Sequence, residues 1–319
     1  MAETGSVMKV ADALRGEVGK AVVGQSALVD GLLVGLLTGG HVLVEGVPGT
    51  AKTLVARALA LALDASFKRI QFSPDMMPAD VVGTNVFDAS NGSFALRKGP
   101  VFANLLLADE INRTPPKTQA ALLEAMQEGQ VTIDGVSHAL PQPFMVIATQ
   151  NPVEYEGTYP LPEAQLDRFQ LKLVVEYPSE TEEIEIVRRH AGGTSWTDLA
   201  ALGLRPVASL ADIEAARAEL SRVVVDEGVV GYVTAIIRTS REHGSVALGA
   251  SPRAAVSLLA ASSATAVLAG RDFVTPDDVK VMAFPCLRHR VLLRPEVEIE
   301  GVAIDGVLRD IIESVPVPR

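Results

Sequence analysis

The sequence predicts an α/β protein with a parallel five-stranded sheet, followed by a smaller, all-helical domain. In the first half of the chain, short apolar runs alternate with segments of helical periodicity, which is typical of parallel strands joined by helices. After Tyr177-Pro178, nearly every segment has helical periodicity. Of the 319 residues, 48% are hydrophobic and 21% are charged, so the chain can bury a full core. We therefore expect one domain over residues 1–178 and a second over residues 179–319.

Five apolar runs are the candidate strands of the first domain. Short apolar runs also occur in buried helices, so the flanking turn residues decide between the two interpretations. Leu105–Ala108 and Met145–Ala148 are apolar at every position, as expected for strands covered on both faces. The five runs are His41–Glu45, Phe67–Phe72, Asn104–Ala108, Phe144–Ala148 and Gln170–Val175.

Helical periodicity and turn residues define the remaining elements. Gln130–Leu140 breaks the helical pattern, and its Asp134-Gly135 dipeptide predicts a β-hairpin. Thr275-Pro276 is a typical helix start, with a capping hydroxyl followed by proline in the first turn. The predicted helices are Thr53–Leu63, Thr118–Glu128, Glu180–His190, Ser209–Arg222, Asp226–Arg241, Pro252–Ala269 and Thr275–Arg288.

Charge and cysteine content weigh against several classes of protein. A net charge of −11 and a pI near 5.0 are unlike a nucleic-acid-binding protein, which needs a clustered positive surface, and they fit a cytoplasmic protein. Cys286 is the single cysteine, so no intrachain disulfide forms, and no Cys or His pair has zinc-ligand spacing. The uncharged run Ala254–Gly270 is shorter than the ~20 residues of a membrane span and is rich in Ala and Ser. We interpret it as a buried helix and expect no membrane span.

The loop between the first strand and the first helix has the sequence of a phosphate-binding loop, with one departure. Loop amides and the positive end of the following helix bind anionic phosphates. In this pattern Lys52 reaches the β- and γ-phosphates of a nucleotide, and Thr53 coordinates Mg²⁺. Ala51 stands where the general pattern has glycine, and the alternative is a helix-capping turn with a chance Lys-Thr pair. The loop comprises Gly46, Val47, Pro48, Gly49, Thr50, Ala51, Lys52 and Thr53.

Two carboxylates follow the buried strand Leu105–Ala108. Ligands of open α/β sheets bind at the carboxyl ends of the strands, so Asp109 is the candidate Mg²⁺ ligand, directly or through water. Glu110 is the candidate general base that orients and deprotonates an attacking water. Alone, an Asp-Glu pair after an apolar run is also typical of a solvated strand end. Downstream of a phosphate loop, it indicates nucleotide hydrolysis.

A set of motifs in a fixed order resembles the MoxR family of AAA+ ATPases, and the resemblance covers nearly the whole chain. Ala51 in the phosphate loop is the family's usual form, so this departure is normal among the relatives. The resemblance implies that Val23 and Gly24 lie beside the adenine. The motifs are Val22–Gln25, the phosphate loop Gly46–Thr53, the acidic motif Asp109–Arg113 with Lys117 and Gln119, and the hairpin Gln130–Leu140 before the first sensor.

The resemblance implies roles for three more residues, each with an alternative. Asn151 matches the first sensor, which holds the attacking water, and the alternative is a plain turn residue. Arg168 matches the arginine finger, which stabilises transition-state charge in a neighbouring subunit's site. The alternative for Arg168 is an ion pair with Asp167 or Glu163. Arg253 matches the second sensor, which reports the γ-phosphate to the helical domain, and the alternative is a surface arginine at a helix start.

These residues predict an enzyme that hydrolyses ATP to ADP and phosphate with Mg²⁺. The resemblance implies that hydrolysis drives chaperone-like remodelling, maturation or activation of a partner protein, often one with a von Willebrand factor A domain. It also implies a hexameric ring of identical subunits. Arg113 and Lys117 either line a neighbour's site or bridge to nearby acids. The sequence leaves the client protein, the pathway and the ring size open.

Three other functions fit parts of the sequence. A P-loop kinase would have an acceptor pocket and no arginine finger, and Arg168 with Asn151 weighs against it. Glu110 weighs against a nucleotide-regulated binding module that hydrolyses only slowly. A nucleic-acid motor needs a stripe of aromatic and basic residues, and the acidic chain has none.

Overall fold

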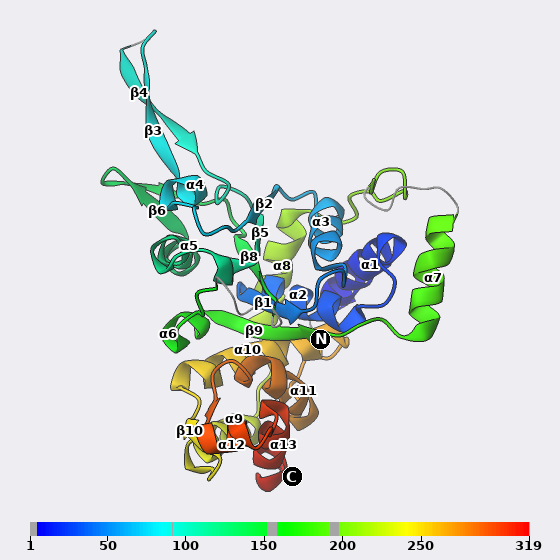
Figure 1. Ribbon diagram of the computed structural model, residues 1–319. Helices are drawn as coiled ribbons and strands as arrows, with labels where there is room; N and C mark the ends of the chain where they lie inside the picture. Colours follow the sequence, from blue (N-terminus) through cyan, green and yellow to red (C-terminus); the bar gives the residue numbers. More distant parts are fainter. Residues whose placement is uncertain (1–4, 91, 152–157, 192–197, 319) are drawn as a thin grey trace.

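A computed structural model describes residues 5–90, 92–151, 158–191 and 198–318 of the chain. A five-stranded sheet with helices on both faces forms one part, and a group of helices lies along one side of it (Figure 1). The strand order is β2-β5-β8-β1-β9, and every neighbouring pair runs parallel. No helix within the described ranges is long and apolar enough to cross a membrane.

All five predicted strands are present in this sheet, and their ends differ from the predicted ends by at most two residues. The strands are β1 (His41–Gly46), β2 (Phe67–Gln71), β5 (Leu105–Asp109), β8 (Met145–Gln150) and β9 (Phe169–Val175). The helices of this part are α1 (Gly5–Ala21), α2 (Ser26–Thr38), α3 (Lys52–Ala62), α4 (Pro78–Val82), the short 3₁₀ helix η1 (Ile111–Arg113), α5 (Pro116–Glu128) and α6 (Glu163–Leu166).

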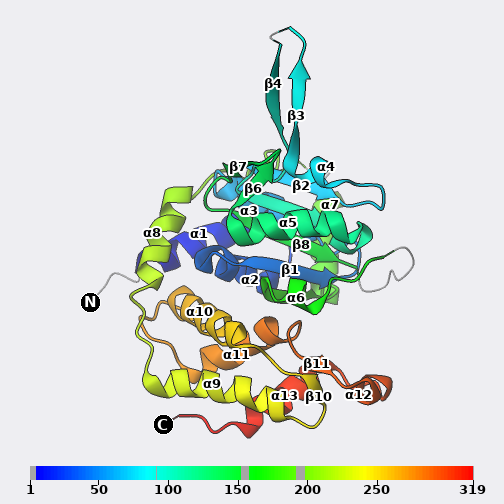
Figure 2. The ribbon, with the colours of Figure 1, turned by 90° about the vertical axis from the view of Figure 1, so that its left-hand side faces the viewer.

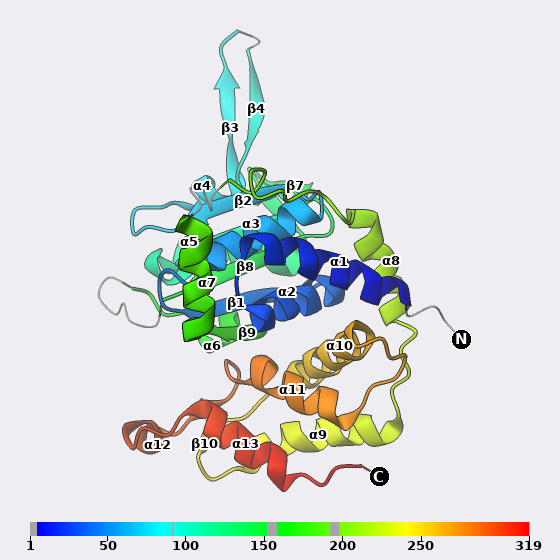
Figure 3. The same cartoon turned by 90° about the vertical axis from the view of Figure 1, so that its right-hand side faces the viewer.

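The described part of the chain after β9 consists of helices joined by loops, as the periodicity predicts, apart from one short ladder and a single bridge between Val224 and Phe273 (Figures 2 and 3). Two short strands pair antiparallel, which helical periodicity does not predict. The elements are α7 (Glu180–Ala191), α8 (Leu210–Leu220), α9 (Glu227–Glu242), β10 (Val246–Leu248), α10 (Pro252–Leu268), α11 (Pro276–Leu287), β11 (Leu292–Leu293), α12 (Pro295–Ile299) and α13 (Ile304–Ser314).

Helix α11 begins where its capping residue predicts. The Thr275 hydroxyl accepts from the backbone N–H of Asp278, and the Asp278 carboxylate accepts from the backbone N–H of Thr275. This reciprocal arrangement satisfies donors that the first turn of a helix leaves without partners. The domain boundary at residue 178 stays a prediction, because α8 lies against α1 and α2 of the α/β part.

The sheet is buried on both faces because successive strand residues point to opposite sides. In β5, Leu105 and Leu107 pack in one core with α1, α2 and α3, whereas Leu106 and Ala108 pack in a second core with α5. All four side chains are fully buried. Strands covered in this way read as continuous apolar runs, which explains why the sequence predicts them.

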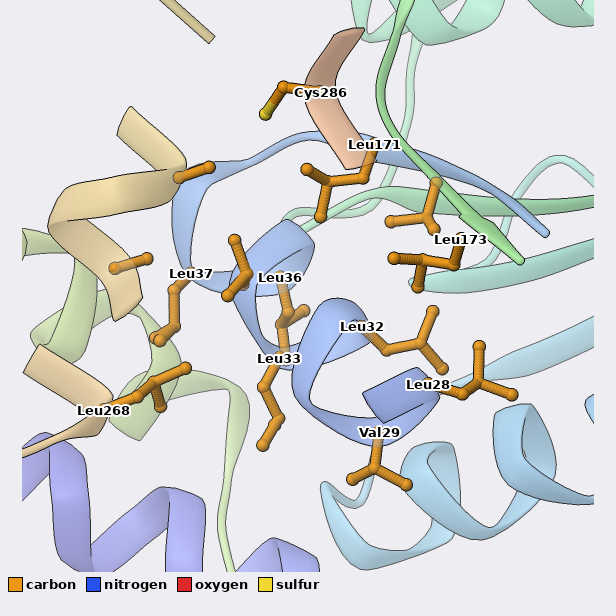
Figure 4. Packing of buried hydrophobic residues seen from close by; sticks show 14 of the residues in the cluster. Leu28, Val29, Leu32, Leu33, Leu36, Leu37, Leu171, Leu173, Leu268 and Cys286 are labelled. Carbon is orange, nitrogen blue, oxygen red and sulfur yellow. The ribbon is translucent and has the colours of Figure 1, made fainter. Parts of the chain in front are cut away.

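Helix α2 connects the sheet with the helical group formed by α9–α13, as Figure 4 shows for α10. Leu32 points toward Leu173 of β9, and Leu37 points toward Leu268 of α10. Gly31 permits the close approach, since a Cβ atom at that position would lie 2.5 Å from Cδ1 of Leu173. The core is therefore continuous from the sheet into the helical group.

Within the described ranges the chain also forms two β-hairpins, of which the sequence predicts one. β6 (Gln130–Ile133) and β7 (Val136–Ala139) pair around Asp134 and Gly135, which have positive φ as the turn dipeptide requires. The missed hairpin, β3 (Gly83–Asp88) with β4 (Ser93–Lys98), projects away from the sheet (Figure 1). Its strands are mostly exposed, so they carry no alternation of apolar and polar residues that would reveal them.

Candidate active site

A cavity of about 500 Å³ opens at the carboxyl ends of β1, β5 and β8, beside the amino end of α3. Ligands of open α/β sheets bind at this edge, and the volume lies within the ~300–1,000 Å³ typical of small-molecule sites. The structure brings together residues that the sequence predicts from separate motifs. Those that line the cavity are Val23, Pro48, Gly49, Thr50, Ala51, Lys52, Thr53, Asp109, Glu110 and Asn151.

The phosphate loop leads from β1 into α3 through two residues with left-handed backbone. Gly49 has a φ of 84° and Ala51 a φ of 61°. Glycine adopts such a conformation freely, whereas alanine pays roughly 1–2 kcal/mol for it. The Thr50 hydroxyl donates to the carbonyl oxygen of Val47 at 3.0 Å and closes the loop from inside. The alanine at position 51 thus keeps the shape of the loop at a small cost in stability.

Lys52 begins α3, and its ammonium group folds back over the loop. Nζ donates to the carbonyl oxygens of Gly46 and Val47. Burial lowers the pKa of Lys52, and the negative charges of Asp109 and Glu110 oppose that effect. The ammonium therefore lies between the loop and the acidic pair, where a phosphate oxygen could exchange with the two carbonyl groups.

Thr149 of β8 fixes the acidic pair at the end of β5. Its hydroxyl donates to Oδ1 of Asp109 at 2.5 Å and accepts from the backbone N–H of Glu110 at 2.9 Å. Asn151 follows two residues later, is buried, and lines the same cavity. Sequence analysis missed Thr149, whose one visible signal is a polar residue at the end of an apolar strand. One buried hydroxyl therefore orients both acidic residues.

Arg69 and Gln71 of β2 also contact the acidic pair, and sequence analysis missed both. Arg69 donates to Oδ2 of Asp109 at 2.7 Å, and Gln71 Nε2 donates to Oε2 of Glu110 at 2.8 Å. Arg113 donates to the same Glu110 oxygen at 3.0 Å, so it bridges to an acid of its own chain. Residues two apart in a strand share a face, which places both β2 side chains on the cavity side. Polar residues on edge strands often face only solvent, so this spacing alone did not reveal the site.

The far end of the cavity is formed by the segment after α1, by α7 and by Leu202. Val23, Ile186 and Leu202 give this end an apolar wall. Gly24 has a φ of 71°, and a Cβ atom at this position would lie 2.6 Å from Oε1 of Glu182 on α7. The positive φ of Gly24 favours glycine at this position, and the end of the Glu182 side chain lies against it.

Arg168 lies at the amino ends of the strands (the amino edge), opposite the cavity at their carboxyl ends (the carboxyl edge). It directly precedes β9, where Phe169 is paired with His41 at the start of β1. The phosphate loop begins at the other end of β1, at Gly46. Five residue steps at ~3.3 Å place the Arg168 backbone about 17 Å from the loop. Its guanidinium donates to the carbonyl oxygen of Leu123 on α5 at 2.8 Å.

Arg253 also lies outside the cavity, at the exposed start of α10. The Ser257 hydroxyl, one turn further along α10, accepts from Arg290 at 3.3 Å. Arg290 in turn pairs with Asp167 at 2.8 Å. The predicted residues that do not line the cavity are Gly24, Gly46, Val47, Arg113, Lys117, Arg168 and Arg253.

Comparison with known proteins gives concordant matches. A family model described as "ATPase family associated with various cellular activities (AAA)" matches residues 41–171, and an "AAA lid domain" model matches residues 238–311. The chain is 46% identical to the uncharacterized protein YeaC of Bacillus subtilis, over 94% of this chain and 92% of that protein. It is 41% identical to the chaperone MoxR1 of Mycobacterium tuberculosis, over 95% and 81% of the two chains. A crystal structure of a putative ATPase from Cytophaga hutchinsonii superposes with a TM-score of 0.90 and 40% identity, covering 98% of this chain and 97% of the other.

Proposed function

The chain belongs to the MoxR family of AAA+ ATPases, and on that premise we propose that it hydrolyses ATP with Mg²⁺ to remodel, mature or activate a partner protein. One observation carries the proposal: Lys52, Asp109, Glu110 and Asn151 converge on one cavity at the carboxyl edge of the sheet. A phosphate loop, an acidic pair and a polar sensor are the groups that nucleotide hydrolysis requires.

The loop and the residues around it suit a magnesium nucleotide. The 11-residue helix α3 directs its positive end at the loop, where the phosphates are proposed to bind. Lys52 would turn from the loop carbonyls to the β- and γ-phosphates. The hydroxyl of Thr53 and the carboxylate of Asp109 are hard oxygen donors, which Mg²⁺ prefers, and the bound ion would supply charge neutralisation on the phosphates. Val23 and Gly24 are proposed to lie beside the adenine.

Glu110 is the proposed general base, and the hydrogen bonds that its carboxylate accepts in this structure have to break before it can act. Its carboxylate is engaged by Gln71 and Arg113, so it must turn from them toward the attacking water. The backbone N–H of Glu110 stays bonded to the Thr149 hydroxyl. Asn151 is proposed to hold the water against the γ-phosphate from the end of the adjacent strand.

Arg168 and Arg253 are proposed to act at an interface between copies of the chain. Neither lines the cavity of its own chain, and the Arg168 backbone is about 17 Å from its own phosphate loop. Arg168 would stabilise transition-state charge on a neighbour's ATP, and Arg253 would report the γ-phosphate to the helical domain. We propose a closed homo-oligomeric ring, hexameric as the family resemblance implies.

The proposed remodelling function is supported by sequence similarity to related proteins. A relative 41% identical to this chain bears the name chaperone, which supports a protein client. A partner with a von Willebrand factor A domain and a cytoplasmic location are the finer proposals. For remodelling itself, residues of α7 line the cavity together with the strand ends, and we propose that nucleotide turnover there moves α7 relative to the sheet.

Phosphate release and ATP binding, measured on the same preparations, test the proposal. Glu110→Gln keeps the shape and removes the base, so we expect retained ATP binding and a loss of turnover on the order of 10²–10⁴-fold. Lys52→Ala should lose ATP binding itself. The matched change Glu313→Gln, on the exposed face of α13, should leave both quantities unchanged. Equal loss of binding and turnover in Glu110→Gln would assign Glu110 a structural role instead.

The same variants test the client. ATP-loaded Glu110→Gln should retain a partner protein that Lys52→Ala releases. A protein captured equally by both variants is not a client of the ATP-bound state.

A further inference from the structure

Arg290 is a buried arginine between the helical group and the start of β9, and it has no part in the proposed reaction. Its side chain is 3% exposed. Nε donates to Oδ1 of Asp167 at 2.8 Å, and Nη1 donates to the carbonyl oxygen of Cys286 on α11 at 3.0 Å. The Ser257 hydroxyl on α10 also accepts from it. A guanidinium is planar and carries five N–H donors in fixed directions, so these partners define one orientation.

The remaining donors of Arg290 bind the backbone on both sides of Arg168. Nη2 donates to the carbonyl oxygen of Asp167 at 3.2 Å and to that of Phe169 at 2.9 Å. Nη1 reaches the carbonyl oxygen of Gln170 at 3.3 Å. Arg290 thus holds the residues before and after Arg168, and the adjacent His289 also donates through Nε2 to the carbonyl oxygen of Phe169 at 2.9 Å.

We infer that Arg290 is a positioning residue for Arg168. By holding residues 167–170, it makes the placement of α10 and α11 set the direction in which the Arg168 guanidinium points. The inference rests on the proposed role of Arg168 in a neighbour's site. It links two regions that the proposed function leaves separate, the helical group of one copy and the catalytic site of the next.

Geometry, rather than stability, is what this arrangement provides. A buried ion pair is weak evidence for stability, because the cost of removing both charges from water offsets their attraction. Directed hydrogen bonds to Asp167, Phe169 and Gln170 do define the path of the backbone. Misplacing a catalytic group by about 1 Å can cost on the order of 10²-fold in rate. The inference therefore predicts a loss of turnover without a loss of ATP binding.

Two variants and one control separate positioning from folding. Arg290→Gln should lower kcat about 10²-fold with an unchanged Kd for ATP. Asp167→Asn, which keeps the shape of the half-exposed partner, should lower kcat about 10-fold, as expected for one charged hydrogen bond. The control Arg271→Gln breaks the Arg271–Asp278 pair within the helical group, so it should lower thermal stability and leave kcat unchanged.

Mixed assemblies of two variants show which role Arg290→Gln impairs: that of Glu110 in the subunit's own site or that of Arg168 in the neighbour's site. The reference mixture is Arg168→Ala with Glu110→Gln, in which one interface combines an intact Glu110 with an intact Arg168 and should recover activity. Arg290→Gln mixed with Glu110→Gln should recover activity in the same way. Arg290→Gln mixed with Arg168→Ala should stay inactive, because neither subunit then supplies a correctly placed arginine.

Recovery in the mixture of Arg290→Gln with Arg168→Ala would overturn the inference, since it would show that Arg290→Gln subunits still present a working Arg168. Failure of the reference mixture, with both variants present in one assembly by co-purification of two tags, would reject the proposed function of Arg168 itself. The two failures are therefore distinct. Should Arg290→Gln not fold, Asp167→Asn takes its place in the two mixtures that contain it. Activity should then rise above that of Asp167→Asn alone with Glu110→Gln as the partner, and should not rise above it with Arg168→Ala as the partner.

Discussion

The two edges of the sheet carry polar groups in contrasting arrangements. At the carboxyl edge, Lys52, Asp109 and Glu110 open into a cavity, and their partners are side chains and loop carbonyls that a nucleotide can replace. At the amino edge, Arg168 and the residues around it are fastened to buried carbonyl groups. The side chains at the carboxyl edge can exchange their hydrogen-bond partners for a ligand, whereas the hydrogen bonds at the amino edge fix the position of Arg168.

A second hollow, of about 380 Å³, lies beside Arg168 between α5 and α6 and differs from the first cavity in its charge. Its wall includes Glu124 and Glu128 of α5, and two carboxylates next to one guanidinium do not suit a phosphate ligand. Among the residues that the structure describes, Arg168 lines this acidic hollow and does not line the 500 Å³ cavity at the carboxyl ends of the strands. Within the proposed function, one chain therefore carries two half-sites, and each is completed by another copy.

Removing Arg168 gives the largest effect and tests whether the amino edge takes part in chemistry. Arg168→Ala should bind ATP almost normally and lose about 10³–10⁵-fold in kcat, because an arginine finger stabilises charge that develops only in the transition state. Lys52→Ala, at the other edge, should lose binding first. Steady-state phosphate release and equilibrium ATP binding measure the two effects.

The matched control is Arg222→Ala, an exposed arginine just after α8 that lines neither the cavity nor the hollow beside Arg168. An exposed ion pair contributes only ~0–1 kcal/mol, so a loss of kcat below about 10-fold would reduce Arg168 to a surface contact. Wild-type specific activity should also rise with protein concentration until assembly is complete.

Acid should weaken the amino edge through His41. Its Nε2–H donates to the carbonyl oxygen of Met126 at 2.9 Å, and its Nδ1 accepts from the backbone N–H of Val146 at 3.0 Å, so the buried ring is held neutral. Burial lowers its pKa from 6.5 to about 4, against the opposing effect of the Met126 carbonyl. Between pH 6.5 and pH 4 the unfolded chain binds a proton that the folded chain excludes. The free energy of unfolding should therefore decrease as the pH is lowered from 6.5 to 4, by about 3 kcal/mol from this residue.

The free energy of urea unfolding, measured from pH 7 to pH 4, tests this linkage. His41→Gln should be less stable than the wild type at pH 7 and should lose less stability on acidification. His138→Gln, on the hairpin β6–β7, is the matched change and should keep the wild-type slope. An unchanged slope in His41→Gln would show that another group carries the acid sensitivity.

A smaller effect than that of Arg168→Ala is expected at the carboxyl ends of the strands, at Thr149. Thr149→Val keeps the shape of the side chain and removes the hydroxyl that orients Asp109 and Glu110. A hydrogen bond to a charged group is worth ~1.5–3 kcal/mol, so we expect kcat to fall about 10–100-fold. Thr149→Ser retains the hydroxyl and should keep most of the activity. A wild-type rate in Thr149→Val would show that the acidic pair needs no support from β8.

Local patterns predicted the elements that bury apolar surface. The five strands of the sheet were correct because covered strands read as apolar runs, and Asp134-Gly135 correctly placed a hairpin because its turn requires positive φ. The hairpin β3–β4 was missed because its strands are mostly exposed. Phe87 and Phe94 pair with each other in an exposed position, and no buried face imposes a period on their strands.

The sequence by itself determined the α/β fold with its helical extension, the phosphate loop and the identity of the acidic pair, because each depends on residue types at short, fixed spacing. Only the tertiary structure decided which partners hold those groups. Thr149 and Asp109 are 40 positions apart, and Asp167 and Arg290 are 123 positions apart. A hydrogen bond between such residues depends on how strands and helices pack, and a local pattern of apolar and polar residues does not specify that packing.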